Sequence, residues 1–208
     1  MFVLTVDQKA SRSTGDKVPN LLTDLKWLLR RDLAPRVAFG RTIGDEVQGV
    51  LDSPQAVYAV FRHLMRSGQW YLGIGIGGVV TPLPTRSSEG AGAAFVYARE
   101  AVEDAKVLRG RAPVSVRSND SAKAEELQSL LRLLGSIIQN RSAAAWEAAD
   151  LLMDPDGTPT GLKQKDVADR LGISEAAVSK RVKLAALDEE REVLSLVARL
   201  LDELNGTV

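Results

Sequence analysis

The side chains best suited to chemistry in the N-terminal half of this chain are three carboxylates. Asp7 follows the short apolar run of residues 2–6, and Asp45 and Glu46 are adjacent in the stretch 41–51, RTIGDEVQGVL. Asp and Glu are poor strand formers, so we expect this pair at the tip of a hairpin between two short strands. If the sheet brings Asp7 beside Asp45, the two carboxylates repel each other unless a cation or another ligand neutralises them. The pattern therefore predicts a metal site at Asp7 and Asp45, and the alternative is a solvated turn.

Two further residues, which follow the first strand, extend this candidate site. Ser11 and Arg12 stand where a phosphate could bind, because a guanidinium matches the geometry of phosphate oxygens. A surface ion pair between Arg12 and Asp16 is the alternative. The predicted ligand-binding residues are therefore Asp7, Ser11, Arg12, Asp45 and Glu46. No Ser-His-Asp arrangement with suitable spacing is present, and we predict no catalytic residue.

A second candidate site lies at residues 162–183, LKQKDVADRLGISEAAVSKRVK. A helix-turn-helix needs a small residue where the helices cross, a glycine at the turn, and apolar anchors on both helices. Ala168 and Gly172 meet the first two requirements. The anchors are Val167, Leu171, Ile173, Val178 and Val182. This spacing resembles helix-turn-helix regulators of the MarR and repressor types.

The second helix of this motif would present short polar and basic side chains, which suit contacts to base edges and phosphates in double-stranded DNA. Ser174 would cap it, and its first residues would enter the major groove. Glu175 has two interpretations, a contact to cytosine or a charge that stabilises the helix start. The predicted DNA-binding residues are Ser174, Glu175, Ala177, Ser179, Lys180, Arg181 and Lys183. The alternatives are a hairpin used only for packing and an adaptor that binds protein.

Hydrophobic periodicity predicts the elements that position these residues. The order is strand, helix, hairpin, helix, strand, helix, strand up to residue 117, followed by helices alone. Such a split βαβ order predicts an α+β fold, with a mostly antiparallel or mixed sheet and helices on one face. The glycines of GIGIGG (73–78) would allow close packing beside the hairpin. We expect the three tryptophans, Trp27, Trp70 and Trp146, in the core, and His63 as a packed or surface residue.

Composition shifts divide the chain into three parts. Residues 1–117 form the α+β domain, 118–160 form connecting helices, and 161–208 form the helix-turn-helix and a terminal helix. The break at 154–161, DPDGTPTG, would not continue a helix. The terminal helix has an apolar stripe that predicts a homodimer interface, with packing on its own chain as the alternative. The stripe comprises Val193, Val197, Leu200 and Leu204.

Composition limits the classes of function. The 208 residues have zero formal net charge and no cysteine, which excludes disulfides and thiolate chemistry. Residues 160–187 carry six Lys or Arg against three acids, whereas 188–208 carry six acids against two Arg. No stretch approaches the roughly 20 apolar residues of a membrane span. The start of the chain lacks the pattern of a signal peptide, so we expect a cytoplasmic protein without a membrane partner.

The N-terminal motifs resemble known families. IGDE, GIGIG and the segment 94–116 are similar to the palm domain of class III nucleotide cyclases and GGDEF diguanylate cyclases. DQKASR, IGDEVQGVL, GIGIG and AREAVEDAK resemble more closely the SatD family of bacterial proteins, over roughly residues 1–117, with a terminal helix-turn-helix that some members carry. The cyclase resemblance implies that Asp7 and Asp45 hold a divalent cation such as Mg²⁺, or that the domain binds a nucleotide. IGDE lacks one glycine and the aromatic residue of the Gly-Gly-Asp-Glu-Phe signature.

Together these patterns predict a sequence-specific DNA-binding transcriptional regulator. Its degenerate cyclase-like domain would serve for dimerisation or for sensing a ligand. The alternative is an enzyme, a metal-dependent nucleotide cyclase or a related nucleotide-binding protein that uses Asp7 and Asp45.

Overall fold

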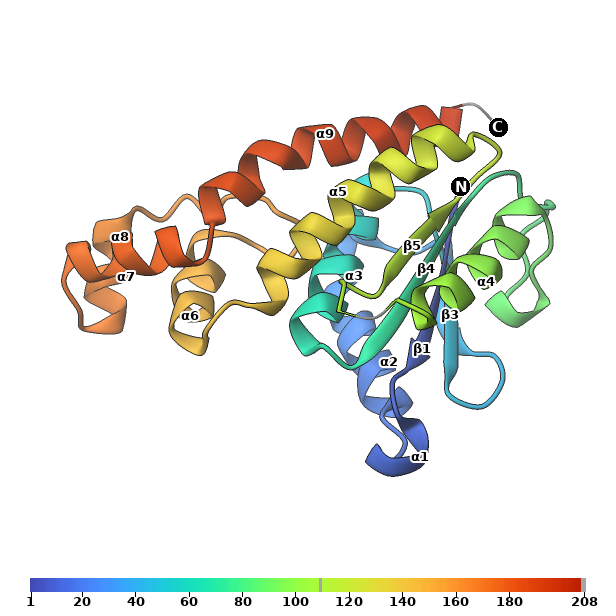
Figure 1. Ribbon diagram of the computed structural model, residues 1–208, viewed down its shortest axis with the longest axis horizontal. Coiled ribbons are helices and arrows are strands. Elements are labelled where there is room, and N and C mark those ends of the chain that lie inside the picture. The colour runs from blue at the N-terminus through green and yellow to red at the C-terminus, as the bar shows by residue number, and fades with distance from the viewer. Residues whose placement is uncertain (109, 207–208) are drawn as a thin grey trace.

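The computed structural model describes residues 1–108 and 110–206, which form an α+β fold around one five-stranded mixed sheet (Figure 1). The strand order is β2-β3-β1-β4-β5, and β1 is antiparallel to both of its neighbours, β3 and β4. In contrast, β4 and β5 pair in parallel. The strands are β1 (Phe2–Gln8), β2 (Val37–Arg41), β3 (Glu46–Leu51), β4 (Trp70–Ile76) and β5 (Val114–Arg117). The predicted order of strands and helices up to residue 117 is confirmed, as is the mixed sheet.

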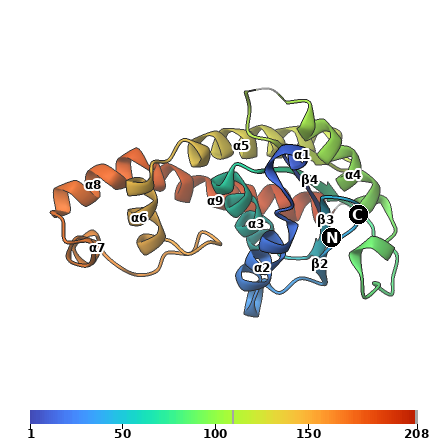
Figure 2. The same cartoon turned by 90° about the horizontal axis from the view of Figure 1, so that it is seen from below.

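Helices cover both faces of the sheet, so the prediction of helices on one face was wrong. Val3 of β1 packs in one apolar cluster with α4 (Ala93–Lys106), whereas Phe2 and Leu4 pack in the other. This second and larger cluster also holds α2 (Val18–Leu28), α3 (Pro54–Ser67) and α5 (Ser121–Gln139). Successive side chains of a strand point to opposite faces, so a strand that is apolar at consecutive positions must be covered on both. Figure 2 shows α4 on the far side of the sheet from α2 and α3.

Glycines in β4 determine how closely α4 approaches. A Cβ at Gly73 would overlap the backbone of Val102, and one at Gly75 would overlap the backbone of Ala94. These glycines therefore allow close packing, as their sequence predicts, but the partner is α4 and not the hairpin. The helix backbone lies directly on the strand because β4 has no side chain at these two positions.

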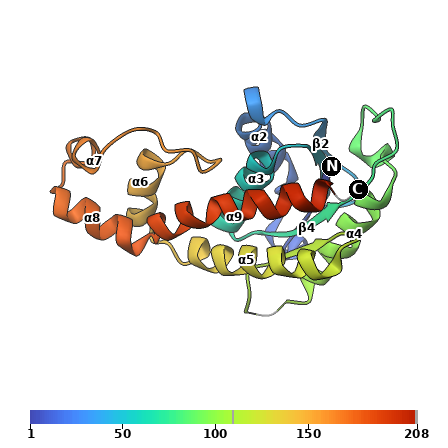
Figure 3. The same ribbon diagram turned by 90° about the horizontal axis from the view of Figure 1, so that it is seen from above.

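The C-terminal part of the chain forms a separate group of helices at one end of the molecule. These are α6 (Ala143–Leu152), α7 (Gln164–Leu171) and α8 (Glu175–Leu184). The last helix, α9 (Leu187–Gly206), returns alongside α5 to the sheet, as Figures 1 and 3 both show. An ion pair of 2.9 Å between Lys123 and Glu203 joins the two helices near that end. The α5–α9 pair thus connects the sheet to the helices α6–α8.

The apolar stripe of α9 is buried within the chain. Val197, Leu200 and Leu204 belong to the large core cluster, and Val193 packs against it. The dimer interface predicted on this stripe is therefore wrong for this arrangement, because α3 and α5 already cover it.

Trp27 also departs from expectation, since 62% of its surface is exposed, whereas Trp70 and Trp146 are buried. The division into 1–117, 118–160 and 161–208 remains a prediction.

Candidate functional site

Helices α7 and α8 are joined by a tight turn with the local structure that the sequence predicts. Gly172 has φ 64°, in the left-handed region that glycine adopts at little cost. The Ser174 side chain accepts a hydrogen bond of 3.2 Å from the backbone N–H of Ala177 and so caps α8. The buried side chains of these two helices are Val167, Ala168, Val178 and Val182. Helix α6 packs against both helices. The result is a three-helix group in which α8 has one face toward α6 and one toward solvent.

The outer face of α8 carries most of the predicted DNA-binding residues. Ser174, Glu175, Ser179, Lys180 and Lys183 are exposed, and Ala177 is half-buried. Arg181 differs from these, because its Nη1 lies 2.7 Å from Oε2 of Glu147 on α6. This guanidinium is directed toward its own chain. The exposed basic charge of α8 therefore comes from the two lysines.

The sheet does bring the N-terminal carboxylates together. Asp7, at the end of β1, is directly opposite Glu46 in the β1–β3 register. Asp45 lies in the turn that precedes β3, and the Thr42 hydroxyl donates to the Glu46 carboxylate. A residue that the sequence reasoning missed completes the group: Nζ of Lys106 on α4 lies 2.9 Å from the Asp7 carboxylate.

The pKa values of this cluster reflect burial and close packing of charges. Burial raises the pKa of Asp7, and the nearby carboxylates of Asp45 and Glu103 add to this, whereas the hydrogen bond from Lys106 opposes it. Burial works to lower the pKa of Lys106, but hydrogen bonds to Glu103 and Asp7 outweigh it and raise the pKa. The proximity of Asp7 and Asp45 agrees with the sequence-based reasoning. The charge that compensates Asp7 is an ammonium group.

This donor set does not fit a dedicated metal site. Among residues 1–108 and 110–206, no group of three or more His, Cys, Asp or Glu side chains is arranged to hold an ion. Mg²⁺ prefers octahedral oxygen coordination, and here Lys106 occupies one side of the Asp7 carboxylate. A cation at Asp7 and Asp45 would have to displace that ammonium group.

Ser11 and Arg12 lie on the short helix α1 (Ser11–Thr14), at the same end of the sheet as the β2–β3 hairpin (Figure 1). Ser11 is half-buried and Arg12 is exposed. The alternative of an ion pair between Arg12 and Asp16 is wrong, because Asp16 pairs with Arg41 of β2 at 2.5 Å.

The chain was compared with models of protein families. The SatD family model matches residues 4–189, which is most of the chain. The protein belongs to the SatD family. The match is continuous from β1 to the first turn of α9, so it includes α6–α8 as well as the sheet that carried the resemblance in the sequence. A search of curated proteins gave no match, and neither did a search of the solved structures.

This SatD family member contains a buried ionic cluster, which lies between the sheet and the helices α6–α8. Glu190 of α9 is fully buried and accepts hydrogen bonds from Nη2 of Arg141 at 2.6 Å and from Nε of Arg62 at 3.2 Å. The Tyr58 hydroxyl also donates to this carboxylate. Both guanidiniums lie over the ring of Trp146, at 4.8 Å for Arg62 and 5.0 Å for Arg141. The cluster ties α3 of the sheet part to α6 and α9.

Sequence reasoning did not find this cluster, because its members come from distant positions and share no motif. An acidic residue in an acidic helix start is usually solvated, and Glu190 stands beside Asp188 and Glu189, which are both exposed.

In the described residues, no helix combines the length and the apolar character that crossing a bilayer requires.

Proposed function

We propose that this SatD family protein is a sequence-specific DNA-binding transcriptional regulator that acts in the cytoplasm. The observation that carries the proposal is the outer face of α8, where Ser174, Ser179, Lys180 and Lys183 are exposed on a capped helix that follows a glycine turn. Short polar and basic side chains of this kind suit base edges and phosphates of double-stranded DNA. Figure 1 shows α8 at one end of the molecule, away from the sheet.

The proposal is tested by measuring DNA affinity against salt concentration. The DNA would be the region upstream of the protein's own gene, with a scrambled duplex for comparison. The double variant Lys180→Gln/Lys183→Gln should bind more weakly. The slope of log affinity against log salt should fall by about 0.9 for each phosphate that is no longer neutralised, or about 1.8 in all. Arg181→Gln should have a smaller effect, because Glu147 already neutralises that side chain.

The matched control removes two lysines from α2 and its cap. Lys17→Gln/Lys26→Gln changes the net charge equally but lies on the sheet part of the protein. It should leave the salt slope unchanged. If the control weakened binding as much as the α8 variant, or if the unaltered protein bound neither duplex, the proposal would be wrong.

The proposal includes a homodimer, because one helix-turn-helix reads too few base pairs for tight binding and such proteins usually bind two half-sites. The α9 stripe is covered by its own chain, which leaves the sheet part as the candidate interface. Sedimentation at micromolar concentration measures this directly. A monomer both with and without DNA would contradict the dimer.

A second candidate is a nucleotide-binding palm domain, used for sensing or for cyclase chemistry. The specific observation in its favour is the meeting of Asp7, Asp45 and Lys106 at one end of a sheet with the order β2-β3-β1-β4. A perturbed carboxylate beside an ammonium group is typical of functional sites. Titration with Mg²⁺ and nucleoside triphosphates would test this. Asp7→Asn/Asp45→Asn should abolish any response while leaving DNA affinity without ligand intact. Loss of a measurable nucleotide conversion in that variant would favour the enzyme.

A further inference from the structure

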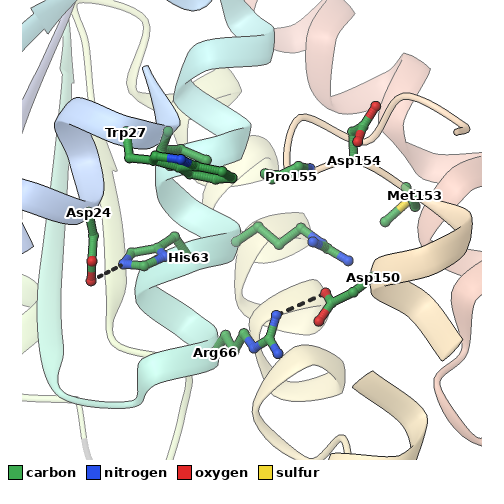
Figure 4. Close-up of a pocket in the computed structure, with 10 residues that line it drawn as sticks. Asp24, Trp27, His63, Arg66, Asp150, Met153, Asp154 and Pro155 are labelled. Atoms are coloured by element: carbon green, nitrogen blue, oxygen red, sulfur yellow. Dashed lines mark hydrogen bonds and ion pairs between the residues drawn. The ribbon is translucent and has the colours of Figure 1, made fainter. Parts of the chain in front are cut away.

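A cavity of about 440 Å³ lies at the junction of the sheet part and the helical group, away from both sites described above. Its volume is in the range of small-molecule sites. It is formed by α2, α3, α6 and the segment that follows α6. The residues lining it are Asp24, Trp27, Leu28, Arg62, His63, Arg66, Asp150, Met153, Asp154 and Pro155 (Figure 4).

One side of the cavity is apolar and flat. Trp27 lies toward Pro155 across the opening (Figure 4), and Leu28 and Met153 add apolar surface. Trp27 is 62% exposed, which is unusual for so large a residue, and the guanidinium of Arg30 lies 4.7 Å from the centre of its ring. A planar ring would cover this indole without displacing any core side chain.

The other side of the cavity carries two arginines, Arg62 and Arg66. Arg62 is buried, and its Nη2 has no hydrogen-bond partner among the described residues, although its Nε donates to Glu190. Arg66 pairs with the Asp150 carboxylate at 2.9 Å. A buried N–H group without a partner is unfavourable, and an anion would satisfy it.

Two of the three acidic residues of the cavity have partners on its wall. Asp24 lies 3.4 Å from Nε2 of His63, and Asp150 is paired with Arg66. Figure 4 shows the Asp154 carboxylate turned away from the other labelled residues. Burial lowers the pKa of His63, whereas the nearby Asp24 carboxylate opposes this shift. Arg62 is thus a buried charged group of the cavity whose Nη2 has an unmet hydrogen-bonding capacity.

We propose that this cavity is a binding site for a small molecule that joins one planar ring to one anionic group, either a carboxylate or a phosphate. The ring would stack on Trp27, and the anion would accept hydrogen bonds from Arg62 and Arg66. This site is distinct from the carboxylate cluster at Asp7 and does not depend on DNA binding.

The test uses benzoate and phenyl phosphate as ligands and benzamide as the uncharged counterpart of benzoate. The chain has three tryptophans, so two-dimensional NMR gives three indole N–H signals, which Trp→Phe variants assign. Trp27 lines the cavity and Trp146 lies under Arg62 and Arg66, so both signals should shift in a saturable way. The signal of Trp70, on β4, should stay in place. Benzamide should bind about tenfold or more weakly than benzoate, because it lacks the charge-assisted hydrogen bonds.

Two variants and one control complete the experiment. Arg66→Gln should weaken benzoate binding about tenfold, and Trp27→Ala should reduce it further by removing the ring contact. Arg117→Gln is the matched control, because Arg117 has the same 43% side-chain exposure as Arg66 and also pairs with carboxylates, but lies on β5. A response to one anion and not the other identifies the anionic group and supports the site. Absence of saturable shifts with both anions, equal binding of benzamide, or an equal effect of Arg117→Gln would overturn the proposal.

Discussion

Replacing Glu190 by glutamine should destabilise the protein more than almost any other single change of charge. The Glu190 carboxylate is fully buried and is the shared acceptor of Arg62, Arg141 and Tyr58. Burial, together with the Glu190 charge, raises the pKa of Tyr58, so the phenol stays a neutral donor. Glutamine keeps the shape of the side chain but leaves two buried guanidiniums without a counter-charge. Removing one partner of a buried ion pair typically costs about 3–5 kcal/mol.

This loss is a large part of the total stability of an ordinary domain, which is about 5–15 kcal/mol. Urea unfolding followed by circular dichroism measures it. With a slope of about 2 kcal/mol per molar urea, the midpoint should fall by about 1.5–2.5 M.

The matched control is Glu147→Gln, which removes the same charge from the partly exposed pair with Arg181. Exposed pairs contribute about 0–1 kcal/mol, so the midpoint should change by less than about 0.5 M. If the two variants were equally stable, or if Glu190→Gln stayed within about 1 kcal/mol of the unaltered protein, the cluster would not hold α9 in place as argued.

Three further predictions concern pH and packing. Burial lowers the pKa of His63, so the unfolded chain binds a proton there more readily than the folded protein does. The free energy of unfolding should therefore fall as the pH drops below about 6.5. Urea titrations at several pH values measure this dependence, and His63→Gln should remove the part of it that His63 causes. Gly73→Ala should cost about 1–3 kcal/mol in unfolding free energy, because its Cβ would overlap the α4 backbone. Gly40→Ala should be nearly neutral in the same assay, because a Cβ there would lie 3.8 Å from its nearest neighbour, the Ser87 hydroxyl. Lys106→Met should raise the pKa of Asp7 further in an NMR titration, because it removes the opposing hydrogen bond and charge.

The local patterns of the sequence predicted the order of the elements well. Hydrophobic periodicity indicated the strands and helices up to residue 117. The glycine turn and the serine cap indicated α7 and α8. These features depend on neighbours within a few residues, where backbone preferences and side-chain spacing act directly. The adjacency of Asp7 and Asp45 was also predicted, because antiparallel pairing of the first strand with the hairpin follows from the split order of the elements.

What the sequence alone could not determine depends on which surfaces meet across long separations. Lys106 reaches Asp7 because the glycines of β4 allow α4 onto that face of the sheet, and Glu190 is buried because α9 returns to α3. A charged residue looks the same in a sequence whether it is solvated or paired inside the fold. Its surroundings are fixed only when packing brings distant helices together, since burial makes an ion pair necessary there and exposure does not. Local order was therefore readable from the sequence, whereas the ionic cluster, the cavity and the partner of Asp7 were decided by the tertiary structure.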